Sequence, residues 1–333
     1  MAGTLTRRNF LSFDFGDRSR DPDHWVRIHR MAMACRFEVM LSSDDAGDMA
    51  AARAALDEAD DLDALITVFR EASVVSHLNR RGAGEDVTIG GTVFGLLERC
   101  AELHAQTGGA FDVTSAPLAR CWSCLEREVR LPTDQEIADA RAIVGMGLVR
   151  LDAAERTVRF EREGVELDFD AIGRGFALDR MGDLLRARGA RRALLSAGHS
   201  TVLALGGKGC GWPVDLRPRL ASRRAGRLFL KSGAVGTSGA GEQDIEIDGQ
   251  RYGQVTDPRT GRLAEGLLGA SVITGDAATA DALSAAFLIG GSDLARDYCE
   301  AHPNVLAVLV LDEPGERTEV FGRYNGATLE MLA

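Results

Sequence analysis

A turn in the C-terminal half of the chain combines an acid, a proline, an arginine and a threonine. The sequence YGQVTDPRTG covers residues 252–261, and its polar centre runs from Asp257 to Thr260. A β-hairpin needs only a pair such as Asp-Gly, which the chain already has at residues 248–249. The additional polar side chains therefore suggest that the turn faces a ligand, although the turn alone does not identify one.

A second candidate site is the predicted start of a helix in LDFDAIGRGFALDR, residues 167–180. Asp168 and Asp170 precede a Gly-Arg-Gly sequence centred on Arg174. A helix N-terminus presents free N–H groups and a positive dipole end to an anion, and glycine lets a phosphate approach the backbone. The segment lacks the full glycine pattern of a dinucleotide-binding loop, so a plain tight turn is the alternative.

A third candidate is Asp281, which heads the apolar stretch ATADALSAAFLIGG at residues 278–291. A carboxylate in the first turn of a helix can interact with the helix dipole. It can equally bind a hard cation, because Mg²⁺ takes one or two carboxylates together with ligand phosphates. The sequence leaves both roles open.

Two further stretches are rich in glycine and small polar residues. GGAFDVTSAPLARCW, residues 108–122, is interpreted as a loop that lines a pocket or caps a helix. AVGTSGAG, residues 234–241, is interpreted as a turn that holds phosphate or links two strands. The histidines His77, His104 and His199 do not have metal-ligand spacing and are interpreted as surface or loop residues.

Hydrophobic periodicity predicts a mixed α+β fold. The expected helices and strands do not alternate as in a doubly wound parallel sheet, which disfavours a Rossmann fold. Residues 67–85 are expected to be mainly loop. The helices are expected at 45–66, 90–107, 134–143, 174–188, 279–289 and 292–300, and the strands at 25–41 (one bent or two), 147–152, 157–162, 165–168, 192–196, 201–206, 212–217, 226–231, 244–248, 251–256, 268–274, 304–311 and 317–322.

Composition excludes several classes of protein. The formal net charge of −11 over 333 residues argues against non-specific nucleic-acid binding, which needs clustered cations. No apolar run reaches the ~18 residues that a membrane span requires. Arg7-Arg8 resembles the start of a twin-arginine signal, but charged residues follow where an apolar stretch is needed, so a cytoplasmic location is favoured over a periplasmic one. Residues 1–24 are expected to form a disordered polar arm and residues 25–333 a single domain.

Seven segments, in this order along the chain, resemble the ApbE family of FAD:protein FMN transferases, from about Met33 to Gly290. They are MACRFEV, FREASVVSHLN, TGGAFDVTSAPLARCW, LDFDAIGRGFALDR, GTSG, DPRTG and ADALSAAFLIGG. The resemblance implies a single T-fold-related α+β unit with a nucleotide cleft. It also implies a Mg²⁺-dependent flavoprotein enzyme that transfers FMN from FAD to a Thr or Ser of an acceptor flavoprotein and releases AMP.

The resemblance also implies the residues of the site. The residues expected to contact the nucleotide are Met33, Phe69, Ala110, Phe111, Asp112, Asp168, Arg174, Thr237, Ser238, Val255, Asp257 and Thr260. The metal is expected to bind the backbone carbonyl of Ala171 and the side chains of Asp281 and Ser284.

Two departures from the family pattern fall at chemically important positions. Gln254 occupies the place of a histidine that could act as a base, and Ala285 occupies the place of a metal-binding threonine. Glutamine cannot accept a proton at neutral pH, and general base catalysis contributes ~10²–10⁴-fold. Two hypotheses therefore stand: an FMN transferase, or a catalytically silent FAD-binding paralogue that serves as a flavin carrier or partner subunit.

Overall fold

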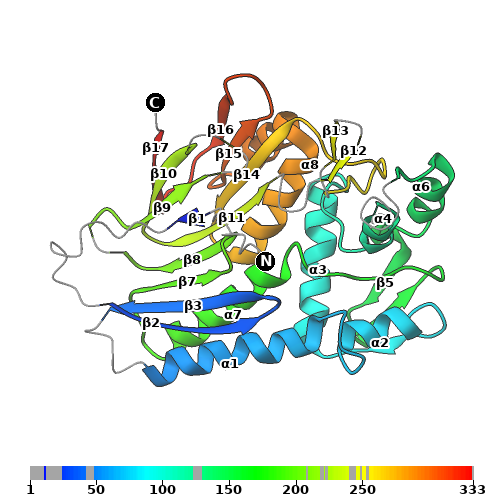
Figure 1. Cartoon of the computed structure of the whole chain (residues 1–333). Helices are drawn as coiled ribbons and strands as arrows, with labels where there is room; N and C mark the ends of the chain where they lie inside the picture. Colours follow the sequence, from blue (N-terminus) through cyan, green and yellow to red (C-terminus); the bar gives the residue numbers. More distant parts are fainter. Residues whose placement is uncertain are drawn as a thin grey trace, which may run out of the picture.

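The computed structural model describes residues 11–12, 25–42, 49–122, 130–207, 209–217, 221, 224–239, 245–247, 250–252 and 255–331. An eight-stranded antiparallel sheet forms its centre, in the order β16-β15-β14-β11-β8-β7-β3-β2 (Figure 1). These strands are β2 (Trp25–Ala32), β3 (Cys35–Ser42), β7 (Ala193–Ala197), β8 (Thr201–Leu205), β11 (Gly233–Gly239), β14 (Leu267–Thr274), β15 (Leu306–Leu311) and β16 (Thr318–Gly322).

One face of this sheet is covered by helices (Figure 1). These are α1 (Met49–Ile66), α7 (Gly173–Ala187) and α8 (Ala277–Ala301). The buried face of α1 consists largely of alanines, which let its backbone approach closely, and it shares a core with Phe37 and Leu41 of β3 and with Leu178 and Met181 of α7. The apolar periodicity of these helices therefore arises from their packing against the sheet.

A second, smaller sheet packs on the opposite face of the central sheet. Its order is β1 (Leu11–Ser12), β9 (Trp212–Leu216), β10 (Gly226–Leu230) and β17 (Ala327–Met331). Val214 and Leu228 of this sheet share a core with Val202 and Val308 of the central sheet. Because β7, β8 and β14 are covered on both faces, every one of their residues is buried, and their sequences are almost continuously apolar.

A flanking subdomain lies beside the helices (Figure 1). Its helices are α2 (Val74–Arg81), α3 (Gly91–Gln106), α4 (Ala116–Trp122) and α6 (Asp134–Arg141). Its small sheet has the order β4-β6-β5, and the 3₁₀ turn η2 (Met146–Leu148) directly precedes β5. These strands are β4 (Val87–Thr88), β5 (Val149–Asp152) and β6 (Thr157–Phe160). A separate two-stranded hairpin consists of β12 (Ile245–Ile247) and β13 (Gln250–Tyr252). Leu97 of α3 and Phe287 of α8 belong to one buried cluster, so the subdomain is packed directly onto α8.

The mixed α+β prediction is confirmed, but four local predictions are wrong. Residues 108–122 are not all loop, because their second half forms α4. Residues 67–85 contain α2, which begins where the Ser73 hydroxyl accepts the N–H of Ser76. The expected turn at 234–241 contains β11, whose small residues lie under α8. The expected strand at 165–168 is absent, because the backbone of Leu167 pairs with the side-chain amide of Asn79 (N–H to Oδ1 2.8 Å, Nδ2 to O 3.0 Å) in place of a strand.

The two helices expected at 279–289 and 292–300 are joined in α8, which is interrupted at Gly291, where φ is 71°. Leu11 and Ser12, within the expected N-terminal arm, pair with β9 as β1. Arg7, Arg8 and Gln254 lie outside the described residues. Within the described part of the chain, no helix is both long and apolar enough to span a membrane.

Candidate functional site

Asp281 is a buried carboxylate at the centre of the candidate site. It lies in the first turns of α8 and is only 4% exposed. Its Oδ2 accepts the backbone N–H of Gly175 (3.1 Å), and its Oδ1 accepts the hydroxyl of Thr201 (2.9 Å). Burial raises the pKa of Asp281 to about 6, although the charge of Arg174 and both hydrogen bonds act in the opposite direction. The site thus holds a carboxylate whose negative charge a cation would stabilise.

Close backbone contacts bring this carboxylate to the N-terminal turn of α7. A Cβ atom on Gly175 would lie 2.1 Å from the carbonyl oxygen of Ala277, so only glycine allows α7 to approach α8 this closely. On the other side of α8, a Cβ atom on Gly236 of β11 would lie 2.2 Å from the carbonyl oxygen of Ala280. The first turns of α8 are therefore held between α7 and β11.

The backbone before α7 offers an oxygen ligand. Gly175 donates its N–H to Asp281 and not to the carbonyl four residues earlier, which belongs to Ala171. Among the described residues, no backbone N–H donates to the Ala171 oxygen. A free carbonyl and a buried carboxylate are the hard oxygen donors that Mg²⁺ prefers, so this part of the expected ligand set fits a divalent cation.

The hydroxyl groups near α8 are divided between the two faces of β11. Ser284 donates to the carbonyl of Asp281 (2.8 Å) and contacts the hydroxyl of Ser238 (2.8 Å). Thr237 contacts its cross-strand neighbour Ser271 (3.1 Å), because successive strand side chains point to opposite faces. Of the two nucleotide-contact residues predicted on β11, the structure thus brings only Ser238 to α8.

Arg174 adds a positive charge at the same helix end. Its Nη1 donates to Asp170 (2.7 Å), and its buried Nε has no hydrogen-bond partner within the described chain. Burial lowers the pKa of Arg174, but the negative charges of Asp281 and Asp170 raise it by more than burial lowers it, so the pKa lies above its ordinary value. A buried, charged N–H without an acceptor is the kind of donor that an anionic ligand satisfies.

Asp168 connects this helix end to the loop at residues 108–115. Its N–H donates to the carbonyl of Val113 (2.8 Å), and its Oδ1 accepts the N–H of Asp170 (2.9 Å). Burial raises the pKa of Asp168. Asp168 and Asp112 therefore belong to neighbouring backbone segments, as the sequence interpretation expected of residues that share one site.

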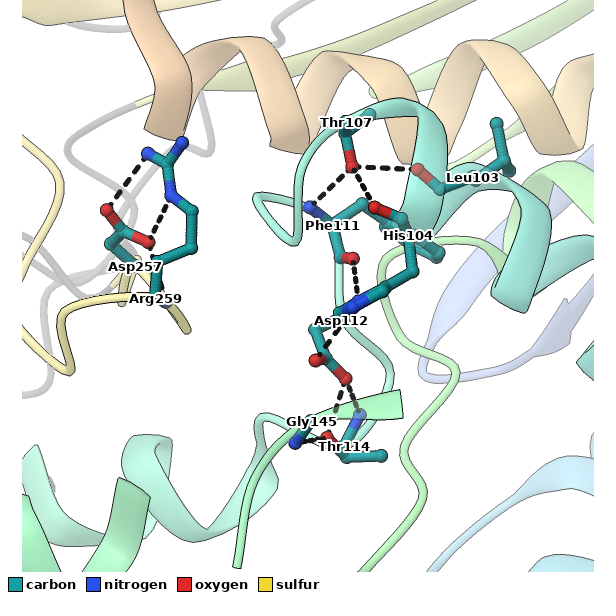
Figure 2. A network of polar contacts seen from close by, with 9 residues as sticks. All are labelled: Leu103, His104, Thr107, Phe111, Asp112, Thr114, Gly145, Asp257 and Arg259. Atoms are coloured by element: carbon teal, nitrogen blue, oxygen red, sulfur yellow. Dashed lines mark hydrogen bonds and ion pairs between the residues drawn. The ribbon is translucent and has the colours of Figure 1, made fainter. Parts of the chain in front are cut away.

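The loop after α3 is organised by a network around Asp112 (Figure 2). Asp112 Oδ1 accepts the N–H (2.8 Å) and hydroxyl (2.6 Å) of Thr114, and Thr114 Oγ1 accepts the N–H of Gly145 (2.7 Å). Asp112 Oδ2 lies 3.2 Å from Nδ1 of His104, which is also 3.1 Å from the carbonyl oxygen of Phe111. The hydrogen bond that His104 donates to the Asp112 carboxylate raises the pKa of His104, and burial partly offsets this rise.

His104 was missed as a site residue because it was interpreted as surface or loop. It is instead a half-buried residue of α3, and the chain folds back onto it through Gly108 and Gly109, whose φ angles are 57° and 82°. The Gly-Gly pair after a helix was the available sequence signal. Ala110 and Phe111 are buried in the core, and the backbone N–H groups of both donate to Thr107, so in this structure neither is exposed to a ligand.

The DPRTG turn is stabilised largely by its own polar groups. Asp257 accepts the backbone N–H and the guanidinium of Arg259, with Oδ1 to Nε 2.9 Å and Oδ2 to Nη2 3.0 Å (Figure 2). The indole of Trp122 donates to the carbonyl of Gly261 (2.8 Å), and Arg141 donates to that of Arg259 (2.6 Å). The turn is thus attached to α4 and α6 through its backbone, and the pairing of Asp257 with Arg259 accounts for much of its polar composition without a ligand.

The same turn still adjoins the Asp112 network. A Cβ atom on Gly109 would contact both the His104 ring (3.4 Å) and Cγ of Arg259 (3.6 Å), so the loop and the turn meet there. Thr256, just before Asp257, is buried and its hydroxyl has no partner among the described residues. Thr260 uses its hydroxyl to accept the N–H of Arg262 (3.1 Å) and is exposed.

The remaining predicted contact residues lie at the edge of these elements. Met33 occupies the β2–β3 turn with a positive φ of 47° and packs against the core. Val255 is half-buried and accepts the N–H of Ala264 (2.8 Å) through its carbonyl. Phe69 follows α1 and its side chain is 92% exposed, so in this structure it reaches none of the other predicted site residues.

Comparison with known proteins places the chain in a family. Residues 31–310 match the ApbE family, and the chain belongs to it. It is 25% identical to the FAD:protein FMN transferase of Vibrio cholerae over 257 residues, which cover 75% of this chain and 76% of that protein.

Solved structures agree with this assignment. The ApbE protein of Thermotoga maritima superposes with a TM-score of 0.80 at 27% identity, covering 91% of this chain and 97% of its own. The flavinyl transferase ApbE of Pseudomonas stutzeri superposes with a TM-score of 0.76 at 26% identity, covering 90% and 95%.

Proposed function

We propose that this chain binds FAD and transfers its FMN moiety to a Thr or Ser hydroxyl of an acceptor flavoprotein, releasing AMP. The acceptor oxygen forms a bond to the phosphorus of the FMN half, the pyrophosphate P–O bond to AMP breaks, and AMP leaves with the bonding electron pair. The proton of the hydroxyl passes to solvent or to a base. Membership of the ApbE family and the names of the related transferases support this proposal.

The observation that carries the proposal is the buried carboxylate of Asp281 beside the N-terminal turn of α7. A Mg²⁺ ion would be held by Asp281 and the carbonyl of Ala171, with Ser284 contributing at most one lone pair, since its hydroxyl already has two hydrogen-bond contacts. When bound, the metal would neutralise charge on the phosphate oxygens. No group of three His, Cys, Asp or Glu residues in the described chain could hold a metal, so phosphate oxygens of the ligand would complete a site that has one protein carboxylate.

The protein groups have separate roles in this proposal. The guanidinium of Arg174, with its unpaired Nε, would bind a phosphate oxygen, and the N-terminus of α7 would add its dipole. The loop at residues 110–112 and the turn at Val255–Thr260 would position the two ends of the dinucleotide. The hydroxyl of Ser238 would face the same cleft from β11.

A silent FAD-binding paralogue is the second candidate, and one observation favours it. Ala285, one turn beyond Asp281 on α8, offers no oxygen to the metal. A weakened metal site leaves binding intact and removes much of the electrostatic stabilisation on which phosphoryl transfer depends. This candidate predicts retention of intact FAD.

The test is to incubate the purified protein with FAD and an acceptor peptide that offers Thr and Ser hydroxyls, with and without Mg²⁺, and to quantify FAD, FMN, flavin-bearing peptide and AMP in the retained and free fractions. Release of AMP that depends on Mg²⁺ supports the transferase. Retention of intact FAD without AMP supports the silent paralogue, and neither retention nor AMP contradicts both.

A further inference from the structure

Asp179 on α7 binds the beginning of a different helix. Its Oδ1 accepts the N–H of Ala277 (2.7 Å) and its Oδ2 accepts the N–H of Ala278 (2.8 Å), which are the first two residues of α8. These N–H groups have no acceptor within α8 itself, because the first four amides of any helix lack an intrahelical partner. One half-buried carboxylate therefore attaches the end of α8 to α7.

The same helix end already has a local cap. Asp276, directly before α8, accepts the N–H of Thr279 through its Oδ1 (2.8 Å). A cap of this kind stabilises the start of a helix, because it satisfies an amide that has no partner within the helix. Within the described part of the chain, the hydrogen bond of the Asp276 side chain stays within α8, whereas those of Asp179 connect α8 to α7.

The candidate cation site is divided between these two helices. The Ala171 carbonyl lies two residues before α7, and Asp281 lies four residues beyond the first residue of α8. The hydrogen bond from Gly175 to Asp281 is the contact between the halves (3.1 Å), and it lies one turn from Asp179 along α7. A displacement of α8 relative to α7 would separate the two oxygen donors.

We propose that Asp179 is a positioning residue: by attaching the first turn of α8 to α7, it holds the Asp281 carboxylate against the N-terminal turn of α7, where the cation site is formed. The cation part of this inference rests on the proposed function. The helix-docking part rests only on the contacts of Asp179, Gly175 and Asp281.

The test compares Asp179→Ala with the matched control Asp276→Ala, which removes an acid cap from the same helix end without changing the connection to α7. Three quantities are measured for each: the free energy of unfolding in urea, hydrogen exchange of the Gly175 amide in metal-free protein, and the affinity for Mn²⁺ by calorimetry. Both variants should lose stability to a similar extent. Only Asp179→Ala should accelerate exchange at Gly175 at least tenfold relative to amides in the middle of α7, and only it should weaken Mn²⁺ binding at least tenfold.

Equal effects of the two variants on Gly175 exchange and on Mn²⁺ affinity would overturn the proposal, because Asp179 would then be only a helix cap. If Asp179→Ala does not fold, Asp179→Asn retains one acceptor oxygen and should show the same pattern at smaller amplitude. Absence of Mn²⁺ binding by the unaltered protein would count against the proposed metal dependence, and Gly175 exchange alone would then decide the role of Asp179.

Discussion

At the scale of single residues, His104 is a titratable group whose position is set by two specific contacts. The imidazole of His104 lies between the carbonyl of Phe111 and the carboxylate of Asp112, at the junction of the glycine-rich loop with the DPRTG turn. Its protonated form is stabilised mainly by Asp112, a contact that also fixes how the loop leaves α3. His104 therefore links local electrostatics to the shape of the candidate site.

The first prediction concerns the charge of this histidine. The pKa of His104 should be above the ~6.5 of a free histidine, and Asp112→Asn should lower it, because the amide no longer stabilises the cation. NMR titration of the imidazole resonances in both proteins measures this directly. A His104 pKa that is the same in both proteins would contradict the assignment of Asp112 as its main partner.

The same shift makes stability depend on pH. A folded-state pKa above the unfolded value means that the native protein binds the proton more tightly, so the contribution of His104 is fully present below pH ~6.5. It is lost as the pH rises through the folded-state pKa. As the pH rises from ~6.5 through the folded-state pKa of His104, the free energy of unfolding should thus fall further in the wild-type protein than in Asp112→Asn.

At the scale of elements, the approach of α7 to α8 depends on the absence of one side chain. Gly175→Ala would place a Cβ atom 2.1 Å from the Ala277 carbonyl oxygen, so the helices must move apart. Overpacking of this kind reduces stability by typically ~1–3 kcal/mol. Urea unfolding should show this loss, and Mn²⁺ affinity should fall with it.

Gly95→Ala is the matched control for this prediction. Gly95 is exposed within α3, and a Cβ atom there would have no heavy atom within 4 Å. Alanine should stabilise the helix at that position by about 0.5–1 kcal/mol. A similar response of the two variants would mean that Gly175 is not at a close contact between helices.

Elements with strong periodicity or caps could be predicted from the sequence, and elements defined by distant partners could not. The helix ending near Gly108-Gly109 and the helix beginning near Gly173 follow from apolar spacing and glycine. The extended backbone at Leu167 could not be distinguished from a strand, because its partner is the side chain of Asn79, 88 residues earlier. Likewise β11 was interpreted as a turn, because its Gly-Thr-Ser composition reflects the close approach of α8.

Some residues of the candidate site could likewise be predicted from the sequence, and others could not. Asp281 and the Gly-Arg-Gly helix start could be found from the sequence, since a carboxylate or glycine is unusual at those positions. Thr201, Asp179 and His104 could not, because their roles arise only when β8, α7 and α3 are packed together. Much of the polar density of the DPRTG turn is also explained by the hydrogen bonds between Asp257 and Arg259 within the turn.

At the scale of the whole molecule, the resemblance to the ApbE family implies that Gln254 and Ala285 stand in the places of a base and a metal ligand. If only the missing groups limit turnover, the double variant Gln254→His, Ala285→Thr should release AMP from FAD faster than the unaltered chain. A restored base alone is worth ~10²–10⁴-fold. An unchanged rate of AMP release, measured by chromatography at saturating Mg²⁺, would show that the cleft differs at further positions.

The proposed function places the Asp281 carboxylate, between α7 and α8, at the centre of a metal-dependent flavin transferase. The most direct measurement is the Mg²⁺-dependent rate of AMP release from FAD by Asp281→Asn and by Asp293→Asn, an exposed acid on the same helix. Asp281→Asn should abolish both AMP release and Mn²⁺ binding, whereas Asp293→Asn should show the AMP release and Mn²⁺ affinity of the unaltered protein. An unchanged rate of AMP release in Asp281→Asn would show that Asp281 is not part of the reaction site.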